Sequence, residues 1–157
     1  MGSGKTAQAS GEAIVVKALL DTSIVVDLLR DHPPAVAWLV EQQEDNDLGV
    51  PPSVWLEIID GVQNLKAQRK AIELLRRFER IPMAPEDFDW AIEQALRFRL
   101  SHNVDVMDCL IAAPSHRLEM PLYTRNVKHF QRILGDAARD PYPSPENAQP
   151  PAAGKTG

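Results

Sequence analysis

Short apolar runs alternate along this chain with segments of helical periodicity. AIVVKALLD (residues 13–21) is nearly continuous and rich in β-branched residues, as buried strands are, and LGVPP (48–52) and PLYT (121–124) are shorter runs that favour a strand. Between these runs, apolar residues recur three or four positions apart, which is typical of helices. Strands separated by helices pair in parallel and carry helices on both faces of their sheet. The sequence therefore predicts an α/β fold.

Residues that favour helix starts precede several of the predicted helices. A serine hydroxyl can cap a helix, and proline suits its first turn. The expected starts are Ser23, Pro33, Ser53 and Pro85, and further helices are expected around residues 107–113 and over 127–134.

The two ends of the chain differ in composition from its middle. Residues 1–13 are small, polar and glycine-rich, and residues 136–157 hold five of the 13 prolines with few apolar side chains to bury. We expect a disordered leader and a disordered tail in these two segments. One folded domain is expected over residues 14–135, because a chain of 157 residues has enough volume for a single core.

The composition argues against a membrane protein and against a disulfide-stabilised one. No apolar run reaches the roughly 18–20 residues that a membrane-spanning helix needs. Cys109 is the single cysteine, so no disulfide can form within the chain. We therefore expect a reducing, cytoplasmic setting and no membrane partner.

A stripe of basic residues runs through positions 66–80, although the net charge of the chain is −5. Such a stripe can follow the phosphate backbone of a nucleic acid. It is more typical of a solvated helix face, because the basic residues interleave with Leu65, Ile72 and Leu75 at helical spacing. Both explanations stay open.

Three acidic residues lie within apolar sequence: Asp21 in ALLDTS, Glu57 in SVWLEIIDG and Asp108 in VMDCLIAA. Burying a carboxylate is costly unless a cationic group compensates it. Each acid also has a structural explanation, since Asp21 and Asp108 could cap helices and Glu57 could pair with an arginine. Asp105 is a better-placed cap than Asp108, which leaves Asp108 for another role.

These acids are expected to converge, because ligands of open parallel sheets gather at the carboxyl ends of the strands. Asp21 follows one predicted strand and residues 124–126 follow another. Three carboxylates within about 4–5 Å repel one another by a few kcal/mol per pair, so without a cation one of them would take up a proton near neutral pH. Oxygen ligands select Mg²⁺ or Mn²⁺ over zinc. We therefore predict a site for one of these ions on Asp21, Glu57 and Asp108.

Four segments carry a resemblance to a known family: LLDTSIVVDLLR (19–30), LEIIDG (56–61), DCLIAA (108–113) and PLYTRNVKHFQRI (121–133). In this order and spacing they resemble PIN-domain ribonucleases, and specifically the VapC-type toxins of bacterial toxin–antitoxin pairs. The resemblance covers about residues 17–134. It implies a PIN-like three-layer α/β/α sandwich whose central parallel sheet has four or five strands.

The resemblance also implies roles for single residues. Asp21, Glu57 and Asp108 match the acidic metal-site residues of the family, and Asn126 falls where many members carry a fourth acid. Asn126 offers a neutral carbonyl oxygen, which lowers the charge of the site and argues against firm binding of a second metal. Weaker candidates, for binding substrate, are Thr22, Thr124, Arg125, Lys128 and His129.

A further departure from the family is Pro114, which falls where members usually continue a helix. Proline removes one backbone hydrogen bond, so we expect the helix to kink or end there, without an effect on the site.

The activity implied by the resemblance is that of an Mg²⁺- or Mn²⁺-dependent endoribonuclease toxin. Asp21 and Asp108 would hold a metal that polarises the scissile phosphate, and Glu57 would orient or deprotonate a water. A homodimer is also implied, as is a cognate antitoxin that places an arginine in the acidic cleft. Two alternatives stay open: a catalytically weak PIN-like domain that binds RNA or a partner, and a structure-specific DNA nuclease of the same lineage.

Overall fold

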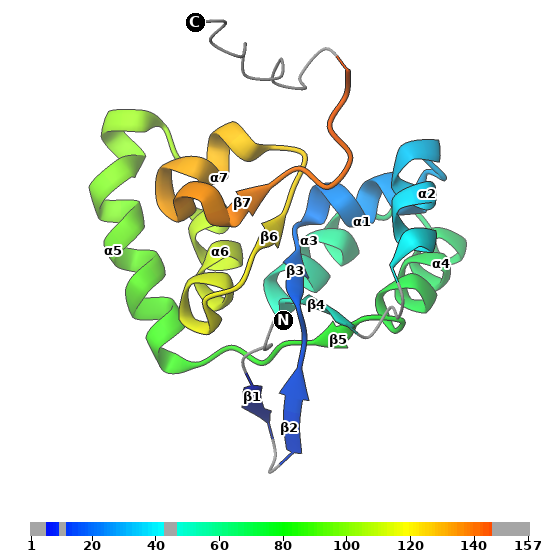
Figure 1. Cartoon of the computed structure of the whole chain (residues 1–157), viewed down its shortest axis with the longest axis horizontal. Helices are drawn as coiled ribbons and strands as arrows, with labels where there is room; N and C mark the ends of the chain where they lie inside the picture. The colour runs from blue at the N-terminus through cyan, green and yellow to red at the C-terminus, as the bar shows by residue number, and fades with distance from the viewer. Residues whose placement is uncertain (1–5, 10–11, 43–46, 146–157) are drawn as a thin grey trace, which may run out of the picture.

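The computed structural model describes residues 6–9, 12–42 and 47–145, and its centre is a five-stranded parallel sheet (Figure 1). The strands of this sheet are β3 (Ala18–Leu20), β4 (Leu48–Val50), β5 (Glu79–Arg80), β6 (Leu122–Tyr123) and β7 (Ala138–Arg139), in the spatial order β5-β4-β3-β6-β7. An antiparallel hairpin precedes the sheet, formed by β1 (Thr6–Ala9) and β2 (Glu12–Val15).

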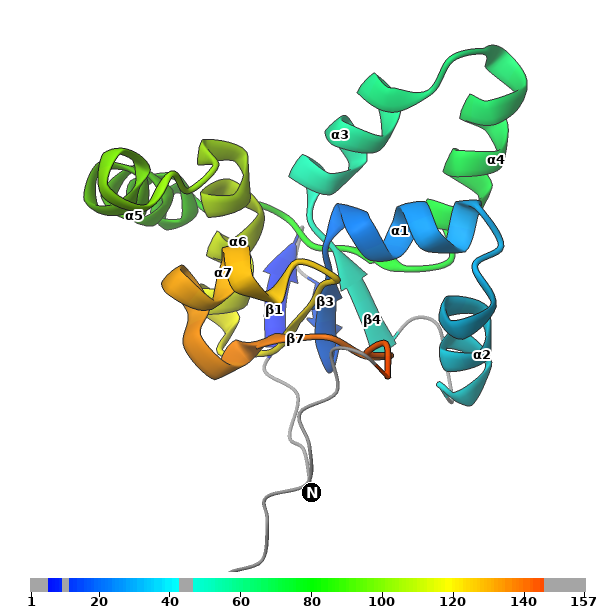
Figure 2. The same cartoon turned by 90° about the horizontal axis from the view of Figure 1, so that it is seen from above.

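Helices cover both faces of the sheet. They are α1 (Thr22–Leu29), α2 (Pro33–Glu41), α3 (Pro52–Gly61), α4 (Leu65–Leu75), α5 (Pro85–His102), α6 (Val106–Leu118) and α7 (Val127–Leu134), with a 3-10 turn η2 (Gly135–Ala137) after α7. Figure 2 shows α1–α4 on one side of the strands and α5–α7 on the other. The chain runs from the central β3 outward to β5 and then crosses to β6 and β7, so right-handed crossovers place the two sets of helices on opposite faces. The predicted α/β/α sandwich is confirmed, with five parallel strands.

Strand β3 lies at the centre of the core and is buried along its whole length. Leu19 and Leu20 are inaccessible to solvent, as expected for a strand with helices on both faces. Gly49 in the neighbouring β4 faces the same core: a Cβ at this position would lie 2.6 Å from Cγ1 of Ile81 and 2.8 Å from Cδ2 of Leu19. Glycine therefore allows the close packing of β4 against its surroundings.

The predicted helix starts are partly confirmed. α2 begins at Pro33 and α5 at Pro85, as expected for proline in a first turn. The prediction of caps at Ser23 and Ser53 is wrong, because α1 and α3 each begin one residue before the serine. α6 continues through Pro114 to its end at Leu118, so the helix does not end at the proline.

The first predicted strand needs correction. The sequence predicts one strand over residues 13–21, but β2 ends at Val15 and β3 begins at Ala18. We expect disorder over residues 1–13 and 136–157. The structure has the β1–β2 hairpin over residues 6–9 and 12–15, and η2 and β7 within the second segment, which it describes up to residue 145; the boundaries of the folded domain stay a prediction. Residues 1–5, 10–11 and 146–157 lie outside the described part of the chain.

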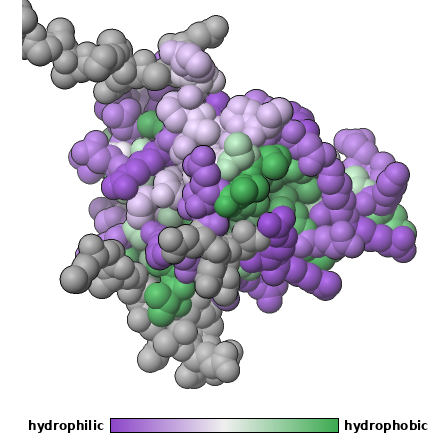
Figure 3. Space-filling view, turned by 45° about the vertical axis from the view of Figure 1, so that its right-hand side comes forward, coloured by the Kyte–Doolittle hydropathy of each residue, from purple (hydrophilic) through white to green (hydrophobic). Residues whose placement is uncertain are grey.

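Apolar side chains gather on two parts of the surface. α5 and α6 frame a groove of about 450 Å³, and the exposed apolar side chains along it are Phe88, Ile92, Leu96, Leu100, Val106 and Met107. Figure 3 brings forward the side of the molecule that carries α2 and α4, and an apolar area lies there among hydrophilic side chains. Val36 and Val40 of α2 are exposed large apolar residues. Within the described ranges, no helix is both long enough and apolar enough to cross a membrane.

Candidate acidic site at the carboxyl edge of the sheet

The neighbouring strands β3 and β6 form the point where the chain reverses its direction across the sheet. Register pairs Leu20 with Tyr123, so the residues that follow them, Asp21 and Thr124, leave the sheet at the same level. β3 leads into α1 on one face and β6 into α7 on the other. Open α/β sheets bind ligands at such a switch point, and both segments that the sequence predicted to converge are found there.

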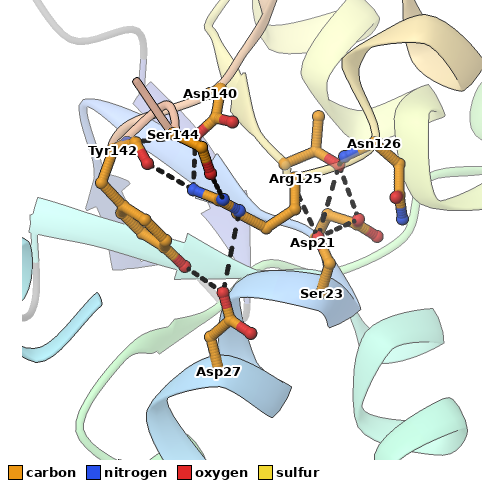
Figure 4. Close-up of polar contacts among 9 residues, drawn as sticks. Asp21, Ser23, Asp27, Arg125, Asn126, Asp140, Tyr142 and Ser144 are labelled. Carbon is orange, nitrogen blue, oxygen red and sulfur yellow. Dashed lines mark hydrogen bonds and ion pairs between the residues drawn. The ribbon is translucent and has the colours of Figure 1, made fainter. Parts of the chain in front are cut away.

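Asp21 is buried and is held by two hydroxyl groups. Thr124 Oγ1 and Ser23 Oγ each donate a hydrogen bond of 2.8 Å to the Asp21 carboxylate, and both reach the same oxygen, Oδ2 (Figure 4). Asp21 occupies the N-cap position of α1, but its side chain makes no capping hydrogen bond. Asp21 therefore does not cap α1 through its side chain, and that explanation of the residue is wrong. The other carboxylate oxygen, Oδ1, accepts neither of the two hydrogen bonds from Ser23 and Thr124.

Ser23 links the two segments of the site through a contact with the β6–α7 turn, and the sequence did not indicate this contact. Its hydroxyl accepts a hydrogen bond of 3.0 Å from the backbone amide of Arg125 while donating to Asp21. The Thr124 hydroxyl in turn accepts from the backbone amide of Asn126 at 2.9 Å. The two hydroxyls thus tie the β6–α7 turn to the Asp21 carboxylate.

Glu57 and Asp108 share the electrostatic environment of Asp21. Glu57 lies on α3 and Asp108 in the first turn of α6. Burial, followed by the negative charges of Asp21, Asp105 and Glu57, raises the pKa of Asp108 from 3.8 to about 7. Burial also raises the pKa of Glu57, the Thr22 hydroxyl lowers it, and the charges of Asp21 and Asp105 raise it. The charge of Asp21 therefore lies close enough to Glu57 and Asp108 to make these two carboxyls more difficult to ionise.

Asp105 is a member of this acidic set that the sequence assigned only to capping. Its carboxylate accepts a hydrogen bond of 2.7 Å from the Met107 amide, so the predicted cap of α6 is confirmed. Its charge also raises the pKa of both Glu57 and Asp108. One carboxylate thus serves the helix start and adds to the negative potential of the site.

Two buried hydroxyls near these elements have no hydrogen-bond partner within the described residues: Thr22 Oγ1 on α1 and Ser53 Oγ on α3. Thr22 lies near enough to Glu57 to influence its pKa, but without standard hydrogen-bond geometry. A buried hydroxyl without a partner is costly, so each of these groups is available to a water or a ligand.

The donor groups of this site match the chemistry of Mg²⁺ or Mn²⁺. They are carboxylate and hydroxyl oxygens, which hard divalent cations prefer, and their mutual repulsion is of the kind that a cation relieves. In the described part of the chain, no three His, Cys, Asp or Glu side chains are already arranged as a metal-binding group. Asp21, Glu57 and Asp108 therefore interact electrostatically, but the structure does not hold them in a ready-made arrangement around an ion.

The other residues that the sequence proposed lie around this edge with different surroundings. Asn126 is exposed at the N-cap position of α7, and Lys128 and His129 are exposed on α7 itself. The Arg125 guanidinium instead binds the segment after β7: it donates to Asp140 Oδ1 at 3.0 Å and to the Tyr142 carbonyl. The expected contact of Arg125 with phosphate is thus not favoured by this arrangement.

The basic stripe lies largely on α4, and several of its members have structural partners. Lys70 donates a hydrogen bond of 2.7 Å to the Leu29 carbonyl and lies 3.6 Å from Asp31. Arg80 lies over the ring of Trp55, 5.5 Å from its centroid. The exposed Lys66, Arg69 and Arg76 remain consistent with either a solvated face or a path for nucleic acid.

Comparisons with known proteins agree with this fold. Residues 18–134 match the PIN domain family. Ribonuclease VapC19 of Mycobacterium tuberculosis is 32% identical over 115 residues, covering 71% of this chain and 90% of that protein. Ribonuclease VapC1 of Haemophilus influenzae is 32% identical over 124 residues, covering 73% and 90%. The structure of VapBC-1 from nontypeable Haemophilus influenzae superposes with a TM-score of 0.65 at 27% identity, over 79% of this chain and 97% of that one.

Proposed function

Because the chain belongs to the PIN-domain family and to its VapC branch, we propose that it is an endoribonuclease that depends on Mg²⁺ or Mn²⁺. The observation that carries this proposal is the convergence of Asp21, Glu57 and Asp108 at the switch point of the sheet, with a pKa of about 7 at Asp108. Perturbed acids in this position are typical of a catalytic site. The same family membership supports a cytoplasmic role as the toxin of a toxin–antitoxin pair.

The divalent cation, when bound, would supply positive charge at the scissile phosphate and make a water more acidic. Asp21 and Asp108 are the residues that we propose as its main ligands. The hydroxyls of Ser23 and Thr124 fix one oxygen of Asp21 and leave Oδ1 for this purpose. Fixed ligands lower the entropic cost of binding and set the position of the substrate phosphate.

Glu57 is the residue that we propose to orient the attacking water or accept its proton. Its carboxyl has a raised pKa, which makes it a better proton acceptor than an ordinary glutamate near neutral pH. In-line attack on the phosphodiester would leave a 5′-phosphate and a 3′-hydroxyl. Asn126, exposed beside this edge, would contribute a neutral oxygen, so that one metal rather than two is expected.

Substrate RNA is proposed to approach along exposed cationic residues at this edge. Lys128 lies two residues beyond Asn126 on α7 and is exposed, so it is the candidate for a phosphate contact. The hydroxyl of Thr22 is proposed to reach substrate or a bound water, because it is buried without a partner. Thr124 is wholly buried against Asp21 and serves to position the site, so its role as a substrate contact is not favoured.

A cognate antitoxin and a second copy of the chain are the protein partners that we propose. The structural relative VapBC-1 supports the antitoxin. The apolar groove between α5 and α6 supports a homodimer, because four apolar side chains recur along α5 at every fourth position from Phe88 to Leu100 and continue onto α6. Such a stripe suits packing against an identical helix. Sedimentation would give a dimer that Leu96→Glu dissociates, and a wild-type monomer would refute this assignment.

A catalytically weak RNA- or partner-binding domain is the second candidate. It is favoured by Asn126 in place of a fourth acid. The two candidates differ in one result, since only the nuclease turns over a substrate.

Cleavage of labelled single-stranded RNA by the purified chain tests the proposal. We expect cleavage with Mg²⁺ or Mn²⁺, none in EDTA, and losses of at least about 100-fold in Asp21→Asn and Asp108→Asn, since each removes a group that acts in the transition state. Asp60→Asn, an exposed acid on α3, is the matched control and should retain activity. Cleavage that persists in EDTA, or equal cleavage by Asp108→Asn, would exclude the proposed mechanism.

A further inference from the structure

Residues 140–144, which follow β7, lie over the side chain of Arg125, and we call them the C-terminal strap (Figure 4). They lie beyond residue 134, where the match to the family ends. β7 leads into the strap beside β6: the Thr124 amide donates to the Arg139 carbonyl at 2.9 Å. The strap therefore starts from the same strand end as the acidic site.

The Arg125 guanidinium is surrounded by groups that match its fixed, planar set of donors. Nη1 donates to Asp140 Oδ1 at 3.0 Å and to the Tyr142 carbonyl, and Nη2 donates to Ser144 Oγ at 3.3 Å. Nε lies 3.8 Å from Asp27 Oδ2 on α1, and the guanidinium carbon lies 4.4 Å from the centroid of the Tyr142 ring. Contacts on the edge and the face of a planar cation fix a single orientation.

Tyr142 anchors the strap to the body of the domain. Its hydroxyl donates to Asp27 Oδ2 at 2.9 Å, and its ring lies 5.9 Å from that of Trp38 and 6.2 Å from that of His32. Burial and the hydrogen bond to Asp27 raise the pKa of Tyr142, so the phenol stays a donor at physiological pH. Prolines at 141, 143 and 145 flank the contacting residues and restrict the unfolded strap, which lowers the entropic cost of docking it.

A chain of short contacts connects the strap to the catalytic carboxylate. The backbone amide of Arg125 donates to Ser23 Oγ, and the amide of the next residue, Asn126, donates to Thr124 Oγ1. Both hydroxyls then donate to Asp21 Oδ2. A displacement of Arg125 would thus change the acceptors and donors that orient Asp21.

We propose that the C-terminal strap, through Tyr142 and Asp140, holds Arg125 in place and thereby positions Asp21 and Asn126 at the acidic site. Tyr142 and Asp140 are positioning residues and Arg125 transmits their effect through its backbone, in place of a contact with phosphate. The catalytic part of this assignment rests on the proposed nuclease function; the structural part does not.

The experiment compares full-length wild type with Tyr142→Ala, Tyr142→Phe and Asp140→Ala in two measurements. The first is hydrogen exchange of the Arg125 amide by NMR, which reports its hydrogen bond to Ser23. We expect exchange to accelerate about tenfold or more in Tyr142→Ala and Asp140→Ala. The second is RNA cleavage, for which we expect kcat to fall about tenfold while KM changes less than about threefold, because a misplaced carboxylate acts on the chemical step. Tyr142→Phe keeps the ring on Arg125 and should recover at least about half of kcat.

Leu118→Ala, at the far end of α6 from Asp108, is the control for loss of stability alone. It should lower the melting temperature without changing Arg125 exchange or kcat. The proposal is overturned if the Arg125 amide exchanges at the wild-type rate in both Tyr142→Ala and Asp140→Ala. It is also overturned if a variant exchanges faster at Arg125 but keeps the wild-type kcat. If wild type neither cleaves RNA nor binds Mn²⁺, the nuclease function fails, and the exchange measurement still decides whether the strap holds Arg125.

Discussion

Asp108→Asn should make the metal-free protein more stable at alkaline pH while it abolishes cleavage. The folded state raises the pKa of Asp108 from 3.8 to about 7. At about 1.4 kcal/mol for each pKa unit, this shift corresponds to about 4 kcal/mol. Because the carboxyl is partly exposed and solvent screens its interactions, we take about half, or about 2 kcal/mol. Asparagine has a similar shape and no charge, so it removes this cost.

The direction of the Asp108 pKa shift determines how the stability difference between wild type and Asp108→Asn depends on pH. A carboxyl whose pKa is raised by folding contributes stability that is complete below its unfolded value of 3.8 and is lost as the pH rises through about 7. Wild type therefore loses about 2 kcal/mol over this window and Asp108→Asn does not. The difference between the two proteins should widen from pH 5 to pH 8, where it corresponds to about 4–8 °C in melting temperature.

Urea unfolding in EDTA at pH 5, 6.5 and 8 measures this difference. Asp60→Asn, on the exposed side of α3, serves as the control and should follow wild type at each pH. Mn²⁺ should then stabilise wild type but not Asp108→Asn, because an ion that binds only the folded state raises its stability. A variant that is no more stable than wild type at pH 8, or a difference that does not change with pH, would refute the reasoning.

Three further predictions concern the packing and ion pairing of the fold and the path by which RNA approaches the site. Gly49→Ala should destabilise the fold by about 1–3 kcal/mol in urea, since its Cβ would lie 2.6 Å from Ile81, and wild-type stability would refute the packing argument. Asp87→Ala should cost about 3 kcal/mol by leaving Arg117, which now donates to Asp87 at 2.8 Å, without its buried partner; a loss below about 1 kcal/mol would contradict this. Lys128→Glu should raise KM for RNA by about threefold or more at low salt and leave kcat unchanged, whereas an unaltered KM would remove Lys128 from the substrate path.

Much of the fold follows from local sequence signals, and the exceptions depend on tertiary pairing. The buried strand at Leu19 and the proline-led helices at Pro33 and Pro85 have strong local patterns, and the structure has all of them. β5 and β7 are two residues long, and each contains an arginine, so their strand conformation comes from pairing with β4 and β6 rather than from propensity.

The acidic site shows the same division between local and tertiary signals. The convergence of Asp21 with the segment after β6 could be predicted, because parallel strands bring their carboxyl ends together. The link through Ser23 could not, since a hydroxyl beside a helix start is more often a cap. The contact of Tyr142 with Asp27 could not be predicted either, because a proline-rich segment has no local preference for the half-buried position that this side chain occupies.

Binding of Mn²⁺, measured by isothermal titration calorimetry at pH 7.5 in the absence of RNA, tests most directly whether the three acids form one cation site. Wild type and Asp60→Asn are predicted to bind with about one ion per chain, and Asp21→Asn and Asp108→Asn to lose this binding, because oxygen ligands of the site are removed. Equal binding by wild type and Asp21→Asn, or no binding by wild type, would contradict the account.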